Sequence, residues 1–527
     1  MIDERAQSAI LRRTFFGRLF ESDLMPPGLP QVQLVIWVVA FLAAPSTLAP
    51  ILLAKQYIWM QPGMVHATMQ GHRTIALLLS MIATGLITLV IWDNVFPDKR
   101  DGRILGVLPI RARTFVIARM SALLLLFALI VAAMTLLSSI SFGLVNLAFG
   151  GPGGFIGTAG SHFAAAVGLE STVFFGIVAL QCALLNIFGV AIAQRLAVLL
   201  QISLVVGLLQ MPLLLPFFSL PQVPASAPLV GLATCVLALT MYGLSYRRMT
   251  RLALEGTGAS KVRRSRIRDL APLAARLTAL SPAARGICAF TLRTVARSRQ
   301  HRMLLAGWLG LACAVSLGSM VSLVLREGWS AFDAPRPPVL ATPLVFIALT
   351  LCGMRMLFAV PSEIRANWTL RSRQPVPVRY ALDGAAAALL ACVIPAVLLA
   401  FVSAAALWGV RAGMMHAAFC AALGVLLAQL LAIGLDKVPF TCTYVPGKAR
   451  FVKLWPLYLT LFSFYTYTMA ALETRLLRDG GIPQALAVLW GLAIVAAYFR
   501  YRRATEVLDL RFEEEEAETL TVVSARV

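Results

Sequence analysis

Long apolar runs alternate with short polar segments along the whole chain. Each run is about as long as a helix that crosses a bilayer, and none shows the alternation expected of barrel strands. The backbone of a lipid-embedded segment must satisfy its own hydrogen bonds, so these runs are predicted to be helices. About twelve are expected, near 32–54, 74–92, 118–142, 164–190, 196–218, 229–246, 303–325, 339–359, 384–408, 413–434, 454–472 and 482–499. The pattern therefore predicts an all-α, polytopic membrane protein.

Basic residues are concentrated in alternate loops. The amino-terminal segment and the segments after even-numbered runs hold 39 of the 46 lysines and arginines. Because cytoplasmic loops carry the excess of Lys and Arg, both termini and the even loops are predicted to be cytoplasmic.

Composition agrees with this interpretation. Hydrophobic residues make up 59% of the chain and charged residues 13%, about half the share found in soluble domains. The net charge of +22 lies mostly in loops between spans, where basic residues set topology and meet anionic lipid headgroups. We therefore expect the bilayer as a partner and no nucleic acid.

Neither a metal site nor a catalytic centre stands out. The eight cysteines include no CxxC pair, and the five histidines are scattered without metal-ligand spacing. The sequence predicts no metal ligand and no catalytic residue.

The runs divide into two sets of six. Residues 247–302 separate the sets and carry 14 basic residues. The expected organisation is a first six-span half (1–246), a basic cytoplasmic linker with a surface helix (247–302), a second six-span half (303–499) and an acidic cytoplasmic tail (500–527).

The two halves are predicted to be a parallel repeat. With an offset of 266, Pro109 and Arg113 match Pro375 and Arg379. A repeat of this kind is a common plan for transporters, and it predicts that residues 74–142 and 339–408 superpose as helix pairs joined by a cytoplasmic loop.

The loop after the second run is the most informative segment. Asp101 can cap a short helix that Pro109 ends. That helix would present Ile104, Leu105 and Leu108 at the cytoplasmic surface. Either a partner protein or the membrane interface could cover them.

This loop resembles the cytoplasmic loop of type-two ABC exporter permeases. The likeness rests on Asp101, Ile104, Leu105, Leu108, Pro109, Ile110, Thr114 and Ala118. In that family the loop forms the coupling helix that docks on a separate ATPase, so the resemblance implies coupling roles for five of them: Asp101, Ile104, Leu105, Leu108 and Pro109. It also implies a bacterial inner (plasma) membrane location.

A second copy of the loop, 361–380, is similar but departs from the pattern. Asn367 replaces the aspartate and Gln374 replaces the leucine before Pro375. Leu370 is its nearest apolar counterpart, and we expect this copy to couple more weakly. Residues 290–302 resemble the membrane-surface helix that precedes the first span in the family, with 11–21 as the counterpart in the first half.

ATP is expected on the partner and not on this chain. The phosphate-binding pattern GxxxxGK[ST] is missing, since Gly447-Lys448 is followed by alanine. The chain is therefore expected to hold no cofactor and to be a transport subunit, not an enzyme.

Polar residues within the spans are few. Gln181, Asn186, Gln201 and Gln210 could line a path or bond between helices. Glu170, Asp383 and Asp436 lie near the edges of predicted spans, where a charge costs little. The leading interpretation is the permease of an ATP-driven exporter working by alternating access. A twelve-span secondary transporter and a membrane-embedded enzyme or scaffold are the alternatives.

Overall fold

The protein is all-α wherever its structure is described. The computed structural model describes residues 4–20, 31–92, 95, 111–214, 224–255, 269–362, 367, 372, 377–442, 457, 460–507 and 510. Within these residues the regular structure is helical, with no strand. The chain forms two compact units whose boundary falls between Arg264 and Ser265, inside the predicted basic linker. Each unit is described by itself.

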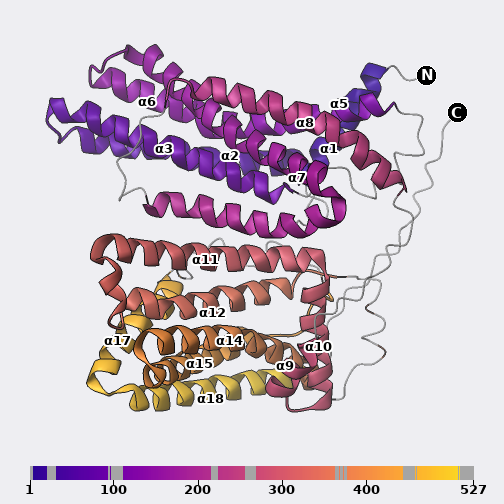
Figure 1. The fold of residues 1–527 in the computed structure, drawn as a ribbon, viewed down its shortest axis with the longest axis vertical. Helices are drawn as coiled ribbons and strands as arrows, with labels where there is room; N and C mark the ends of the chain where they lie inside the picture. The colour runs from indigo at the N-terminus through magenta and orange to yellow at the C-terminus, as the bar shows by residue number, and fades with distance from the viewer. Residues whose placement is uncertain are drawn as a thin grey trace. The chain divides into compact units, whose positions relative to one another are not determined.

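The described part of the first unit contains six helical stretches (Figure 1). They are α1 (Glu4–Phe20), α2 (Gln31–Tyr57), α3 (Pro62–Val90), the continuous stretch α5 (Ala112–Val131), η2 (Ala132–Leu136) and α6 (Leu137–Ala148), then α7 (Gly154–Leu214) and α8 (Ala227–Glu255). The π-turn η2 inserts one wide turn into an otherwise α-helical span.

Small residues let the helices of the first unit approach closely. Helix α7 packs against α3, α6 and α8. A Cβ on Gly168 would lie 2.5 Å from the carbonyl carbon of Ala227, and one on Gly85 would lie 2.8 Å from Leu208. Since hydrophobic burial does not drive helices together in lipid, such close backbone contacts supply the van der Waals packing.

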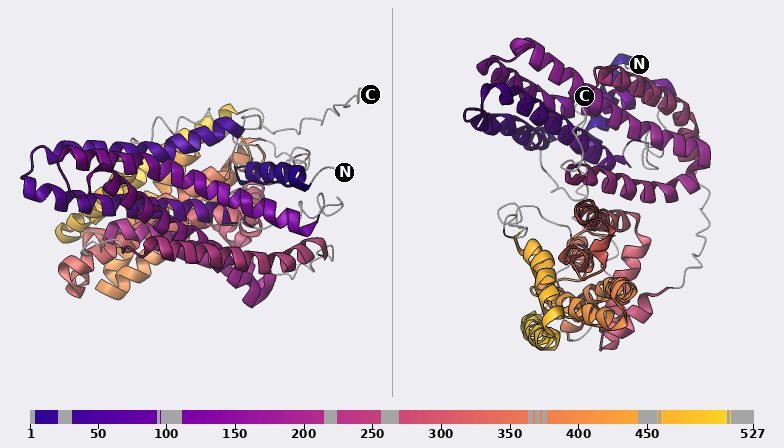
Figure 2. Two further views of the ribbon diagram at one scale, coloured as in Figure 1. Left: turned by 90° about the horizontal axis from the view of Figure 1, so that it is seen from above. Right: turned by 60° about the vertical axis from the view of Figure 1, so that its left-hand side comes forward.

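The second unit is a bundle with two short helices at its start. Its elements are α9 (Ala271–Thr278), α10 (Pro282–Arg297), α11 (Arg299–Glu327), η4 (Trp329–Phe332), α12 (Pro337–Leu357), α14 (Arg379–Trp408), α15 (Val410–Ala432), η6 (Phe464–Thr468), α17 (Met469–Asp479) and α18 (Ile482–Glu506). Helices α12, α14, α15 and α18 pack on one another around an alanine-rich core. The right-hand view of Figure 2 looks along several of these helices.

Nine of the described helices are long and apolar enough to cross a membrane. They correspond to nine of the predicted spans. The predicted span 32–54 lies within α2, and the span 196–218 overlaps the shorter apolar helix Leu199–Met211. Only part of 454–472 belongs to the described residues. A multi-pass membrane protein is thus confirmed, and the total of about twelve stays a prediction.

Each unit also has a helix that precedes its first span and packs on its third. In the first unit, Leu11 and Phe15 of α1 are buried against Ala118 and Ala122 of α5. In the second, α10 runs across the ends of the spans (Figure 1) and contacts α14. The α10–α14 contact is so close that a Cβ on Gly384 would lie 2.7 Å from the Ala284 carbonyl oxygen. The same pairing of elements therefore occurs in both halves.

Candidate functional site

Most of the predicted coupling residues fall outside the described residues. This applies to Asp101, Ile104, Leu105, Leu108, Pro109, Leu370 and Pro375. Asn367 is described and buried. Its side-chain Nδ2 donates a hydrogen bond to the Thr441 carbonyl oxygen at 2.8 Å. Asn367, one of the two positions at which the second loop departs from the family pattern, therefore attaches that loop to Thr441.

Thr441 belongs to a turn after α15, residues 437–442, which we call the Phe440 turn. Phe440 donates its backbone N–H to the Phe358 carbonyl at 3.1 Å and accepts from the Ser362 N–H at 3.3 Å. Its φ of 71° lies in the left-handed region, which is uncommon for a bulky residue. Surrounding contacts must hold it there, because such a conformation costs on the order of 1–3 kcal/mol.

Those contacts come from three elements. The Phe440 ring meets the His301 ring edge-on at 4.6 Å, and the rings of Phe290 and Phe358 lie at 6.2 Å. His301 also hydrogen-bonds the Val360 carbonyl through Nε2 at 3.0 Å. The start of α11, the end of α12, α10 and the Phe440 turn thus form one connected assembly at one end of the second unit.

The four predicted path-lining residues all lie on α7. Gln181 donates to the Trp92 carbonyl at 2.9 Å, and Asn186 donates to the Ser245 hydroxyl of α8 at 2.8 Å. Gln201 is buried and Gln210 is half-buried. The first two side chains therefore make bonds that tie α7 to its neighbours, which is the structural alternative to a path-lining role.

A buried carboxylate lies inside the first unit. Glu170 is completely buried, and its Oε1 accepts a hydrogen bond from Thr135 of η2 at 2.8 Å. Its Oε2 has no hydrogen-bond partner among the described residues. At a rise of 1.5 Å per residue, Glu170 lies roughly 24 Å along the helix axis from Gly154, the first residue of α7. Glu170 is thus deep in the helix, contrary to the expectation that it lies near a span edge.

A histidine is buried in the same unit. His162 lies two turns before Glu170 on α7, and its Nε2 is 3.4 Å from the Ser138 hydroxyl. Thr135 and Ser138 belong to η2 and the first turn of α6. Because π-turns are frequent at functional sites, the polar groups gathered around η2 are a candidate site.

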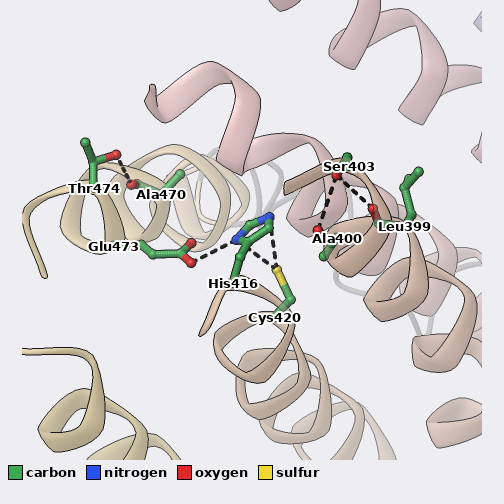
Figure 3. Close-up of polar contacts among 8 residues, drawn as sticks. All are labelled: Leu399, Ala400, Ser403, His416, Cys420, Ala470, Glu473 and Thr474. Atoms are coloured by element: carbon green, nitrogen blue, oxygen red, sulfur yellow. Dashed lines mark hydrogen bonds and ion pairs between the residues drawn. The ribbon is translucent and has the colours of Figure 1, made fainter. Parts of the chain in front are cut away.

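The second unit contains a buried histidine–glutamate pair (Figure 3). His416 of α15 and Glu473 of α17 are joined by a 2.8 Å contact between Nδ1 and Oε1, and both side chains are at most 2% exposed. The Oε2 atom of Glu473 has no hydrogen-bond partner among the described residues. The pair links two helices deep inside the bundle, where an unpaired charge would be costly.

Cys420 lies beside this pair, one helical turn after His416. The thiol, imidazole and carboxylate together have the residue types of a nucleophile, a base and an orienting group. The geometry does not favour that role, because the Cys420 sulfur is 3.8 Å from both ring nitrogens and so faces the ring rather than one nitrogen. All three side chains are also buried. Across the described residues, no cluster of His, Cys, Asp and Glu has the arrangement of a metal site.

These two glutamates were missed or misplaced by the span boundaries. The predicted span ended at residue 472, whereas α17 continues to Asp479 and carries Glu473 into the bundle. The predicted fourth span began at 164, whereas α7 begins at Gly154. Extending the span that ended at 472 by two turns would have included Glu473. Glu170 was already inside the predicted span, and starting that span at Gly154 moves the residue away from the edge.

Asp383, another residue noted in the sequence, is paired. Arg500 of α18 donates to Asp383 of α14 at 2.6 Å and to Gln429 of α15 at 2.7 Å. This bridge joins three helices of the second unit.

Compared with known proteins, the chain matches no family model, no curated protein and no solved structure.

Proposed function

We propose that this chain is the membrane-spanning permease subunit of an ATP-driven exporter. It moves its substrate by alternating access, and a separate ATPase subunit hydrolyses the ATP. The observation that carries the proposal is the pairing of a pre-span helix with the third span in both units, α1 on α5 and α10 on α14. The resemblance to exporter permeases implies two fused halves, each with a surface helix before its first span.

The pairing also gives a route from the loops to the spans. Each long loop that is predicted to be cytoplasmic is followed by the span on which the pre-span helix packs. In the first unit the Phe15 and Phe115 rings meet at 4.8 Å, and the Arg119 guanidinium lies over the Phe15 ring at 4.9 Å. A push on the loop would therefore move the third span and the pre-span helix together.

The proposal is tested by Leu105→Asp in the first loop. An apolar anchor at a protein interface contributes on the order of 1–2 kcal/mol, so its loss weakens assembly roughly tenfold. We expect Leu105→Asp to abolish co-purification of the ATPase from native membranes while the chain stays folded. Leu370→Asp is expected to weaken co-purification less, since the second copy departs from the pattern.

The matched control is Leu105→Met, which keeps an apolar side chain and is expected to retain the ATPase. If Leu105→Asp leaves ATPase binding unchanged, the loop rests on lipid and not on a partner. A chain that purifies without any ATPase in mild detergent contradicts the proposal.

A secondary transporter is the second candidate, and the buried glutamates favour it. Glu170 and Glu473 each keep one carboxylate oxygen without a partner among the described residues. Ion-coupled transporters use buried carboxylates of this kind. Under this candidate, Glu170→Gln removes ion-dependent uptake in vesicles that contain no ATPase. Under the exporter proposal, such vesicles show no uptake with either form.

A further inference from the structure

Helix α9 has two apolar faces, and the described residues of the protein cover one of them. Ala275 is buried in the core of the second unit, and the helix packs on α10 and α14. At about 100° per residue, Leu273 and Leu277 point roughly 160° away from Ala275. Leu270 and Leu280 flank the helix. These four leucines, which we call the leucine face, are between 57% and 97% exposed.

The hairpin of α9 and α10 is firmly built. Asp269 accepts from the Ala271 N–H at 3.1 Å and pairs with Arg293 of α10 at 2.6 Å. The hydrogen bond from Arg293 lowers the pKa of Asp269, so this link stays ionised at neutral pH. Arg285 donates to the Ala279 carbonyl at 3.0 Å. The leucine face is thus presented by a fixed helix and not by a loose segment.

The position of the α9–α10 hairpin in the second unit indicates that the leucine face is near the membrane surface. Only Ser298 separates α10 from α11, whose membrane-crossing part begins at Gln300. Because α10 runs across the ends of the spans, it lies at the level of the membrane boundary (Figure 1). The short connection 279–281 keeps α9 at the same level.

Charge indicates which surface the hairpin meets. Arg276, Arg285 and Arg297 are exposed on the two helices. Four further arginines, Arg263, Arg264, Arg266 and Arg268, directly precede Asp269, the sole acidic residue between 261 and 302. Leucines beside arginines on a helix in the interfacial plane are the pattern that binds anionic bilayers.

We propose that α9 is an in-plane membrane anchor whose leucine face enters the cytoplasmic leaflet, with anionic lipid headgroups bound by the arginines around it. The anchor belongs to the second unit and does not depend on an ATPase. It holds α10, and through α10 the start of α14, at a fixed depth in the bilayer.

The test places a fluorescent label at single cysteines in a cysteine-free chain. The purified chain, without any partner, is put in nanodiscs of brominated phosphatidylcholine with or without phosphatidylglycerol. Leu273→Cys and Leu277→Cys are expected to be quenched by brominated lipid as strongly as Leu398→Cys, an exposed position within the α14 span. Asp333→Cys, exposed in the loop before α12, is the unquenched control.

Headgroup charge is tested with the same labels. Arg276→Gln is expected to lower the lipid-inserted population at position 277 about fivefold in phosphatidylglycerol nanodiscs, the effect of one basic residue near an anionic surface. It should have no effect in phosphatidylcholine alone. If aqueous iodide, and not brominated lipid, quenches the fluorescence of the labels at 273 and 277, the anchor proposal is wrong. Labels that neither agent reaches also overturn it, in favour of a protein cover. Equal insertion in both lipids overturns the role of the anionic headgroups.

Discussion

Replacing one residue of the buried His416–Glu473 pair has a different effect on stability from replacing both. Removing one partner of a buried pair leaves the other without compensation and typically costs about 3–5 kcal/mol. Replacing both by apolar residues is often neutral. We therefore expect His416→Leu or Glu473→Met alone to lower the free energy of unfolding by about 3–5 kcal/mol, and the double variant to be close to the parent.

Reversible unfolding in mixed micelles measures this double-mutant cycle. Additive losses would show that the two side chains do not interact. A double variant that is stable but has lost transport would show that the pair acts in function as well as in packing.

Asn367 has a physical reason to differ from the aspartate of the first loop. Its amide donates to the Thr441 carbonyl, and an ionised carboxylate has no proton to donate. An unsatisfied buried group costs about 1–3 kcal/mol. We expect Asn367→Asp to speed amide hydrogen exchange at residues 438–442 by roughly tenfold or more.

Thr441→Ser is the matched control for this prediction. It keeps the backbone carbonyl and a hydroxyl that can still reach Val438, so exchange in the Phe440 turn should not change. If Asn367→Asp exchanges as slowly as the parent, the contact does not hold the turn.

At the scale of elements, the contact between α10 and α14 depends on Gly384. An added Cβ would meet backbone at Ala284 and the Cβ of Ile287, each at 2.7 Å, so α10 would have to move. We expect Gly384→Ala to lower the free energy of unfolding by about 1–3 kcal/mol, as overpacked sites do. A thermal melt of the purified chain measures it.

Gly286→Ala provides the same change on α10 at a position where a Cβ meets nothing within 4 Å. It should be neutral or stabilising by about 0.5–1 kcal/mol, because alanine favours the helix. Equal melting temperatures for both variants would mean that α10 is free to shift on α14.

The helices were the predictable part of this protein, and the polar contacts between them were not. Apolar runs located the spans because lipid imposes length and composition on each helix separately. Where two helices touch is decided by small residues such as Gly168 and Gly384, and these look the same in sequence whether they face lipid or a neighbour. The pairing of His416 with Glu473 depends on which helices contact each other. Neither residue by itself therefore indicated the pair in the sequence.

For the whole molecule, charge predicts orientation. The 39-to-7 division of basic residues places Gly153 outside and Ser260 in the cytoplasm. In a cysteine-free background, a membrane-impermeant reagent added to intact cells should label Gly153→Cys and not Ser260→Cys. Labelling at 260 would require the loss or gain of a span.

The superposition of residues 74–142 on 339–408 stays a prediction. In the structure, α3 is followed by α5 and α6, as α12 is followed by α14, so each half supplies the expected pair of helices. The second pair packs together directly.

The break in α7 at Gly189 has a consequence for how the chain is made. Its φ of 71° and ψ of 170° interrupt an otherwise continuous helical path of 61 residues. Helix α7 changes direction along its length (Figure 1). The span that ends at Gly189 and the predicted span that contains the apolar helix Leu199–Met211 are thus connected by a short segment of chain. Because the connection is so short, one of these helices cannot insert into the bilayer during synthesis while the other stays in water. We therefore expect the two to enter the bilayer together as a helical hairpin. A substitution at Gly189 is then expected to lower the amount of chain inserted in the membrane, whether or not it changes transport by the chains that do insert.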